Sequence, residues 1–337
     1  MKGRLIALDH WQGREAAALM VDGQLEDLLV DCVGVPRLGT VFLARVERPL
    51  KGQGGVIVDW GAGQGFLRRA KGMKAGEKVR VQVSGFAEQG KAPPVTDRLL
   101  FKSRYAIVTP DAPGINVSRA IRDDDRRDAL KGIGVDAMGE MPHGLILRSS
   151  AAEALDTEIA EDIDAMVQAC LETLEQSEVG LAREGDGPHL SAWREWSEAA
   201  QVETAEGSFD ALGVLDAIDH LAQPDIALGP HSMAVEETRA LIAVDVNTGG
   251  DLSPAAGLKA NLAAIRELPR QLRLRGLAGQ ITIDLAPVSK KDRRQIETAL
   301  RAALKADVVE TEFVGWTPLG HIELKRKRER PPLFAKG

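Results

Sequence analysis

Two aspartates in the last third of the chain each follow a run of apolar residues. Asp245 comes after LIAV and Asp284 after ITI, so both carboxylates are expected at the carboxyl ends of buried strands, where α/β proteins bind ligands. Two carboxylates at such an edge suit Mg²⁺, which prefers oxygen ligands and leaves room for waters and a substrate phosphate. Asn247 points to the same face as Asp245 and could orient that phosphate. The alternative is that the aspartates only form turns, as predicted for Asp59.

Basic residues accumulate around these aspartates. One group lies between the two aspartates and a second follows them: Arg266, Arg270, Arg273 and Arg275, then Lys325, Arg326, Lys327, Arg328 and Arg330. A basic block beside a metal site is where a phosphate backbone would bind. The residues that we predict to contact it are Arg270, Arg273, Arg326 and Arg328. The alternative is that these basic residues form an ordinary solvent-exposed surface that binds no ligand.

Two further groups of residues could bind a nucleic acid. Phe66, followed by Arg68 and Arg69, could stack on a base, and Lys91 could add a backbone contact; the alternative for Phe66 is a place in a barrel core. Arg148 and Ser149 end the strand-like GLILR, just before a predicted helix that starts with the capping box 150–153. A guanidinium, a hydroxyl and helix N-terminal amides form an anion site. The alternative is that Arg148 pairs with Glu153 or a neighbouring carboxylate.

Composition restricts the class of protein. The chain has 337 residues, of which 44% are apolar and 28% charged, as is typical of a globular protein with several domains. With two cysteines and no apolar run of about 18 residues, we expect a cytoplasmic protein without a disulfide framework or a membrane partner. The six histidines show no HxH or HExxH spacing, which argues against a zinc hydrolase.

The charge is unevenly distributed. The net charge is −7, but residues 151–206 alone hold 15 acidic and two basic side chains. The rest of the chain is therefore basic, and a nucleic-acid partner is not excluded, because a polyanion responds to the local field.

Hydrophobic patterns predict the elements that position these residues. Strand-like runs at 4–8, 40–46, 55–60, 78–84 and 105–110 alternate with glycines. Five short strands in about seventy residues favour an OB-type barrel, although composition also fits another small β-barrel. An amphipathic helix follows from 150, and 191–230 has a weak helical pattern in which Trp193 and Trp196 are predicted to pack in a core. Strands 240–246 and 280–286 then alternate with helices 254–275 and 290–305, which is typical of an α/β catalytic domain.

Taken together, these segments resemble the ribonuclease E/G family. The strongest likeness is in LIAVDVNTGGD (241–251), NLAAIRELPRQLRLRGLAGQITIDL (261–285) and GWTPLGHIELKRKR (315–328), with support from residues 55–67, 113–126 and 144–150. The resemblance implies a single-strand-preferring endoribonuclease with an α/β (α+β multidomain) fold. Its implied parts are a reduced RNase-H-like subdomain (1–38 and 183–230), an OB-type RNA-binding barrel (39–97), a 5′-end sensor region (98–182) and a pancreatic-deoxyribonuclease-like catalytic domain (231–337).

The resemblance also implies roles for single residues. Asp245 and Asp284 match the two Mg²⁺-binding aspartates, and Asn247 matches the asparagine that holds the scissile phosphate. Phe66 and Lys91 match barrel residues that contact RNA. Arg148 and Ser149 match the pair that recognises a 5′-monophosphate, where the family usually reads Arg-Thr-Ala-Gly and this chain reads Arg-Ser-Ser-Ala.

The chain departs from the family pattern in three further places. Ile57 stands where a second barrel aromatic is expected, and 186–230 is shorter than the family's RNase-H-like part. A zinc-link of the form CPxCxGxG does not follow the basic run, so a zinc-linked tetramer is not expected, whereas a homodimer stays open.

The leading hypothesis is a Mg²⁺-dependent endoribonuclease that leaves 5′-phosphate and 3′-hydroxyl ends on single-stranded RNA, in RNA processing or decay. One alternative is a non-catalytic RNA-binding or ribosome-associated protein that keeps the fold. Another is a ribonuclease that uses the RNA 2′-hydroxyl, with His321 as acid, and leaves a cyclic phosphate.

Overall fold

The chain forms two compact units. The computed structural model describes residues 3–50, 54–68, 72–88, 90–251, 253 and 255–334. Residues 1–30 and 201–337 make up unit 1, and the continuous segment 31–200 makes up unit 2. Unit 2 is therefore an insertion in the sequence of unit 1. Residues 31–38 and 183–200, which we assigned to the RNase-H-like subdomain, belong to unit 2.

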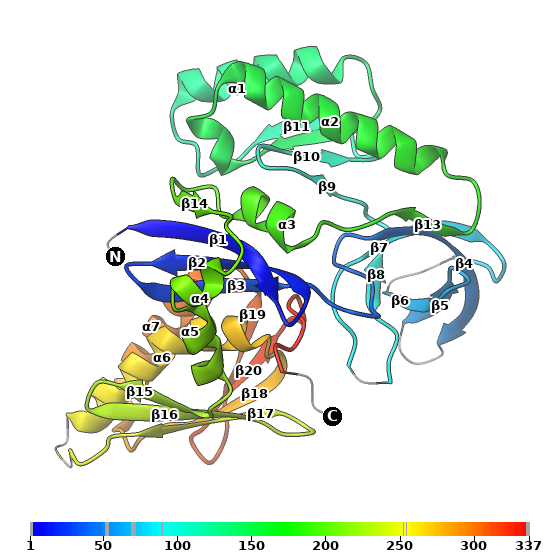
Figure 1. Ribbon diagram of the computed structural model, residues 1–337. Coiled ribbons are helices and arrows are strands. Elements are labelled where there is room, and N and C mark those ends of the chain that lie inside the picture. Colours follow the sequence, from blue (N-terminus) through cyan, green and yellow to red (C-terminus); the bar gives the residue numbers. More distant parts are fainter. Residues whose placement is uncertain are drawn as a thin grey trace. The chain divides into compact units, whose positions relative to one another are not determined.

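Unit 1 contains a four-stranded sheet in the order β14-β1-β2-β3 (Figure 1). Its strands are β1 (Arg4–Trp11), β2 (Arg14–Val21), β3 (Gln24–Val30) and β14 (Gln201–Glu203). β14 is parallel to β1 and the other pairs are antiparallel. Asp22 and Gly23 both have positive φ, as the two-residue turn between β2 and β3 requires. The helices α4 (Ser208–Ala211) and α5 (Val214–Leu221) complete the core of this sheet.

The second sheet of unit 1 carries the two aspartates. Its order is β15-β16-β17-β18-β20-β19. The strands are β15 (Asp225–Leu228), β16 (His231–Glu237), β17 (Ile242–Asn247), β18 (Gly279–Asp284), β19 (Thr311–Trp316) and β20 (Ile322–Arg326). β17 and β18 run parallel and are joined by α6 (Ala256–Arg275). The short 3₁₀ helix η2 (Lys290–Asp292) and α7 (Arg293–Ala306) follow β18.

Alternate residues of this sheet face opposite ways. Val244 and Ile283 pack against Leu268 of α6 and Ile296 of α7 in one hydrophobic core, whereas the other face of β17 and β18 ends in exposed polar residues. The predicted order of strand, helix, strand and helix is confirmed to within a few residues at each end. Pro254, where the first of these helices is predicted to begin, lies outside the described residues.

Unit 2 begins with a closed five-stranded barrel, which confirms the OB-type prediction. Its strands are β4 (Val41–Leu50), β5 (Gly55–Asp59), β6 (Gln64–Arg68), β7 (Lys78–Val83) and β8 (Pro94–Thr96). They pair in the order β4-β5-β6-β8-β7, and a β4–β7 pairing closes the ring. Phe42 and Trp60 stack inside it, with their ring centroids 4.2 Å apart. A further strand, β13 (Gly180–Arg183), pairs with β4.

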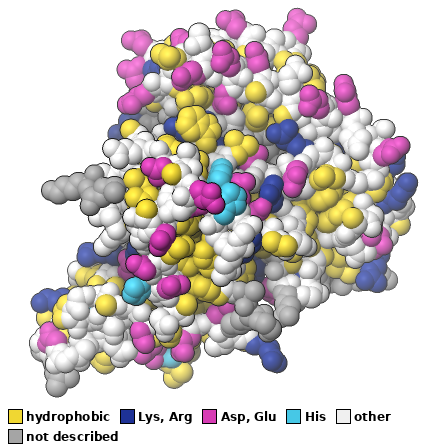
Figure 2. Space-filling view, viewed as in Figure 1, with side chains coloured by type: hydrophobic (Ala, Val, Ile, Leu, Met, Phe, Trp, Pro, Cys, Tyr) yellow, Lys and Arg dark blue, Asp and Glu magenta, His cyan; other side chains and the backbone are white. Residues whose placement is uncertain are grey.

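The remainder of unit 2 is a sheet covered by two helices. The sheet has the order β11-β12-β10-β9, with β9 (Phe101–Lys102), β10 (Ala106–Thr109), β11 (Gly114–Val117) and β12 (Gly144–Leu147). The helices α1 (Asp124–Met138) and α2 (Asp156–Glu175) pack on it through one core (Figure 1). Acidic side chains gather over the part formed by α1 and α2 (Figure 2). α3 (Pro188–Glu195) follows β13.

The strand predicted at 105–110 is β10 of the helix-covered sheet, outside the barrel assigned to 39–97 and within the region 98–182. Two expectations for unit 2 are wrong. The predicted capping box does not start a helix, because the Ser150 hydroxyl donates to the carbonyl oxygen of Arg104. Residues Ser149–Ala152 form the 3₁₀ helix η1 instead, and α2 begins at Asp156. Trp196 is buried as predicted, but the Trp193 side chain is 56% exposed.

Candidate functional site

Parallel pairing brings the two aspartates side by side. Asp245 is the last β17 residue in register with β18, and its partner is Asp284. Neighbouring strands lie about 4.8 Å apart, and paired residues point to the same face. Both aspartates are exposed, on the face opposite the helix-packed core. Two carboxylates from distant parts of the sequence therefore open onto the same solvent-facing spot.

Asn247 belongs to the same group of side chains. It lies two residues beyond Asp245, on the same side of β17, and is exposed. Its Nδ2 donates a hydrogen bond of 2.7 Å to Oδ2 of Asp245. This bond limits the rotation of the Asp245 carboxylate and leaves its other oxygen for a ligand.

His321 approaches the site from the turn before a third strand, β20. Its Nε2 lies 3.5 Å from Oδ1 of Asp284, just before β20 begins. A tight turn sets this position, because Thr317 donates its backbone N–H to the His321 carbonyl and its hydroxyl accepts the His321 N–H. Sequence reasoning considered His321 only as an acid and did not predict its contact with Asp284, which requires β20 to lie beside β18.

The donor set fits Mg²⁺. The ion takes one or two protein carboxylates and keeps several waters, and this spot offers two carboxylates, an amide and open solvent. Within the described ranges, no three His, Cys, Asp or Glu side chains are grouped to hold an ion.

Two of the arginines predicted to contact RNA are buried in ion pairs, which corrects the expectation that they form an outer basic face. The side chain of Arg273 is 8% exposed and pairs with Glu26, Asp27 and Asp307. That of Arg326 is 1% exposed and lies 2.6 Å from Asp307. Burial opposes the charge of Arg273, but the carboxylates raise its pKa above the usual value. Both guanidinium groups therefore neutralise buried carboxylates.

The other predicted basic contacts differ in exposure. Arg270 is partly buried, donates to the Leu25 carbonyl at 3.0 Å and pairs with Glu267. Arg328 is partly buried and lies close to Gly279. A Cβ atom added to Gly279 would be 2.8 Å from Nη2 of Arg328. Arg266, Lys325 and Lys327 are exposed, so they are the more accessible cations of this group.

The barrel residues lie on the outer surface of the barrel. Phe66 pairs with Ile57 across β5 and β6 and is partly buried, whereas Val56, Val58 and Leu67 fill the interior. The Phe66 ring lies over Gly55, where a Cβ would come within 2.6 Å of it. Lys91 is exposed and pairs with Glu88. Arg68 is exposed, and Arg69 lies outside the described residues.

Arg148 and Ser149 do not assemble the predicted anion site. Arg148 pairs with Glu195 at 2.7 Å, so the alternative of a neighbouring carboxylate holds, although the partner is not Glu153. Ser149 is exposed, and the predicted α-helix does not start here: Ser149 begins the short 3₁₀ helix η1, and α2 begins at Asp156. Glu195 lies 47 residues further along the chain, so sequence spacing gave no signal for this pair.

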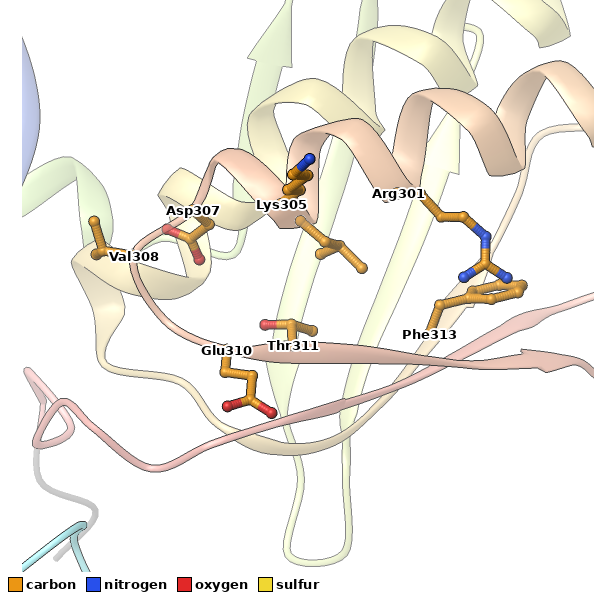
Figure 3. A pocket seen from close by; sticks show the side chains of 8 residues that line it. Arg301, Lys305, Asp307, Val308, Glu310, Thr311 and Phe313 are labelled. Atoms are coloured by element: carbon orange, nitrogen blue, oxygen red, sulfur yellow. The ribbon is translucent and has the colours of Figure 1, made fainter. Parts of the chain in front are cut away.

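A pocket of about 460 Å³ lies elsewhere in unit 1, between the end of α7 and β19 (Figure 3). Figure 3 shows the Arg301 guanidinium over the ring of Phe313, and the two are 4.6 Å apart. None of the residues that line this pocket belongs to the group around Asp245. In the described part of the chain, no helix has the length and apolar character needed to cross a membrane.

The chain belongs to the ribonuclease E/G family, whose model matches residues 101–185 and 191–329. It is similar to ribonuclease E of Nostoc sp., with 26% identity over 98% of this chain and 56% of the relative. Ribonuclease G of Salmonella typhimurium is 24% identical over 87% of this chain and 73% of its own length. Ribonuclease E of Escherichia coli is 25% identical over 96% of this chain and 36% of its own length. The chain thus spans little more than half of the Nostoc relative.

Proposed function

We propose that this protein is a Mg²⁺-dependent endoribonuclease that cleaves single-stranded RNA to 5′-phosphate and 3′-hydroxyl ends, in RNA processing or decay. The observation that carries the proposal is the in-register pair Asp245 and Asp284 on an exposed sheet face, with Asn247 bonded to the first. Membership of a family of ribonucleases supports the choice of RNA as substrate.

The two aspartates would hold the ion through their carboxylate oxygens. Mg²⁺ supplies an activated water and a positive charge beside the phosphate when it is bound. The water oxygen bonds to phosphorus while the bond from phosphorus to O3′ breaks. The proton lost by the water leaves to solvent, and O3′ takes one up. The phosphate stays on the downstream fragment as its new 5′ end.

The other side chains orient this centre. Asn247 holds Asp245 in one rotamer, and its amide faces the same solvent region as the carboxylates. His321 Nε2 lies 3.5 Å from Oδ1 of Asp284, within ion-pairing distance when the imidazole is protonated. Outer partners of this kind typically contribute about 10–100-fold to metal affinity or activity.

Replacement of Asp245 tests the proposal. Asp245→Asn keeps the shape but removes a carboxylate charge, so cleavage of a single-stranded RNA with Mg²⁺ should fall by at least about a hundredfold. Asp219→Asn alters an exposed aspartate of α5 in the same unit and should leave the rate unchanged. Equal rates for Asp245→Asn and the unaltered protein would remove Asp245 from the mechanism.

The two alternatives give different products. A protein that only binds RNA would leave the RNA uncleaved, and no new fragment would form. This alternative is supported by Ile57, which lies beside Phe66 where a second aromatic side chain would stack on a base. Attack by the RNA 2′-hydroxyl with His321 as acid would leave a cyclic phosphate and would not need Mg²⁺. End-group analysis of fragments, with and without Mg²⁺, separates the three mechanisms.

A further inference from the structure

Four basic residues follow the second aspartate of the candidate site. Asp284 is the last residue of β18, and the next elements along the chain, η2 and the start of α7, contain Lys290, Lys291, Arg293 and Arg294. The side chains of both lysines and of Arg294 are exposed, and that of Arg293 is partly buried. These residues were not among the predicted RNA contacts.

The stability of α7 does not explain this accumulation of positive charge. The N-terminus of a helix favours negative charge, yet the first turn of α7 has no acidic residue. The nearest carboxylate in the sequence is that of Asp292, which accepts the hydroxyl of Ser289 at 2.6 Å. In the described part of the chain, no carboxylate is paired with any of the four basic side chains. Their charge is therefore available to an anion from outside the chain.

An aromatic ring holds Arg293 in one orientation. Its Cζ lies 4.7 Å from the ring centroid of Trp316, and Trp316 packs against the core of the sheet. Glu297, four residues further along α7, could pair with Arg293 but instead accepts two hydrogen bonds from Arg301, at 3.0 and 2.8 Å. A guanidinium that stacks on a ring keeps the N–H groups along its edge for an acceptor.

The turn before β20 lies between Arg293 and the candidate site. A Cβ atom added to Gly320 would be 3.0 Å from Nη2 of Arg293. The next residue, His321, has its Nε2 3.5 Å from Oδ1 of Asp284. The hydrogen bonds that join Thr317 to Gly320 and to His321 fix this turn. Arg293 and Asp284 are therefore both neighbours of the same short, fixed turn.

The candidate site needs a cation beside it. The carboxylates of Asp245 and Asp284 are two negative charges on one exposed face, and a bound Mg²⁺ would only neutralise them. An RNA strand brings one further negative charge with each phosphate, so the phosphates that flank the cleaved bond approach a site without net positive charge. A guanidinium binds such a phosphate through two parallel N–H···O bonds.

We propose that Arg293 binds a backbone phosphate of the RNA next to the bond that is cleaved, with Lys290 and Lys291 as further contacts to the same strand. The inference rests on the proposed function, because it names how the RNA is held at that site. Trp316 sets the direction of the guanidinium. A phosphate carries no sequence information, so this contact positions the strand without selecting its bases.

Binding measured without cleavage tests the contact. The affinity for a single-stranded RNA, labelled at one end, is measured by fluorescence anisotropy in EDTA, at KCl concentrations from about 50 to 200 mM. Arg293→Gln should bind about fivefold more weakly than the unaltered protein. The slope of log K against log salt should become shallower by about 0.7, the contribution of one phosphate contact to a single strand. Arg293→Lys keeps the charge and should keep the slope.

Arg301→Gln is the matched control. Arg301 has the same arrangement as Arg293, with its Cζ 4.6 Å from the ring centroid of Phe313 (Figure 3), but it is paired with Glu297. It lies eight residues further along α7, which is about 12 Å of helix and exceeds the Debye length of about 8 Å at physiological salt. Arg301→Gln should keep the affinity and the salt slope of the unaltered protein.

Single uncharged links in the RNA locate the phosphate. A set of oligonucleotides is prepared in which one phosphate at a time is replaced by a methylphosphonate. The replacement that removes the phosphate bound by Arg293 should weaken binding to the unaltered protein but not to Arg293→Gln, because the contact is already absent from that variant. When the unmodified RNA is cleaved with Mg²⁺, the cut should lie next to that phosphate.

Two results would overturn the inference. One is a folded Arg293→Gln variant with the affinity and salt slope of the unaltered protein, and the other is coupling of Arg293 only to phosphates remote from the cut. If thermal melting shows that Arg293→Gln is unfolded, Arg293→Met, which keeps an apolar stem against Trp316, replaces it with the same expected losses. Because binding is measured without Mg²⁺, lack of RNA cleavage would contradict the proposed function alone, whereas an unchanged salt slope would contradict only this inference.

Discussion

At the scale of single residues, the same side-chain type has different roles according to its surroundings. Arg273 and Arg326 were predicted as RNA contacts from their charge, yet they lie inside unit 1 with Asp307. Arg273 also pairs with Glu26 and Asp27, which come from the other end of the sequence, and no local pattern reveals such a partner. Asp245, Asn247 and Asp284 could be grouped in advance because strand ends and alternation are local properties.

Loss of the Asp307 carboxylate should destabilise unit 1. Its side chain is 1% exposed and faces both Arg273 and Arg326. Asp307→Asn leaves two buried cations short of a counter-charge, and breaking a buried pair costs about 3–5 kcal/mol. Urea unfolding should show this loss, while Glu312→Gln, on an exposed part of β19, should stay within about 0.5 kcal/mol of the parent. Equal urea midpoints for Asp307→Asn and Glu312→Gln would show that the ion pairs of Asp307 with Arg273 and Arg326 do not stabilise unit 1.

The two cysteines should react differently. Cys170 is buried in α2, and its burial, with the nearby charge of Asp111, raises its thiol pKa to about 11. Cys32 is partly exposed. Because the thiolate is the reactive form, an alkylating reagent at pH 8 should modify Cys32 in the native protein and Cys170 only after unfolding. Mass spectrometry of peptides identifies the modified residue, and native labelling of Cys170 would be the contrary result.

At the scale of elements, the sheet that carries Asp245 and Asp284 was predicted well, whereas in the first sheet only the strand at 4–8, which is part of β1, was predicted. Residues 240–246 and 280–286 are apolar runs rich in β-branched residues. In the helices that follow them, apolar residues recur with the period of an α-helix, so the local pattern and the tertiary structure agree. β2 has the sequence REAAALMV, whose alanines favour a helix. It is a strand because β1 and β3 pair with it on both sides, and this is information from outside the segment.

Asn261 connects α6 to the segment that follows Asp284. It is fully buried, donates Nδ2 to the Ala286 carbonyl at 2.9 Å and accepts the Ala286 N–H at 2.9 Å. Asn261→Leu leaves both backbone groups without a partner, at about 1–3 kcal/mol for each. Both the unfolding free energy and RNA cleavage should fall.

The matched control is Asn116→Leu, the same chemical change at an exposed position of β11. It should alter neither property. If Asn261→Leu lost stability but kept full cleavage, the bond to Ala286 would not be what positions Asp284.

At the scale of the whole molecule, unit 2 interrupts the sequence of unit 1. The first core of unit 1 combines Leu5, Ala16 and Leu28 with Phe209 and Ile218, so it needs both ends of the chain. The core of the helix-covered sheet and that of the barrel use residues of 31–200 alone. The first core of unit 1 therefore cannot form from one continuous piece, whereas the core of its second sheet uses residues 233–324 alone.

A fragment comparison tests this division. Residues 31–200 alone should unfold cooperatively, since their cores are complete. Residues 201–337 alone keep the core of the second sheet but lack β1 to β3, so a peptide of residues 1–30 should bind to them and raise their melting temperature. Circular dichroism during heating measures this shift. An unchanged melting temperature after addition of the peptide would show that the first thirty residues are dispensable.

The insertion also has a consequence for synthesis on the ribosome. The three strands at the N-terminal end emerge first, but β14, α4 and α5, which complete their sheet, follow only after 170 further residues have been translated. At about 5–20 residues per second, this delay lasts roughly ten to thirty seconds. During that time an apolar face stays uncovered on the nascent polypeptide, so these three strands should be a binding site for a chaperone until residues 201–221 have been made.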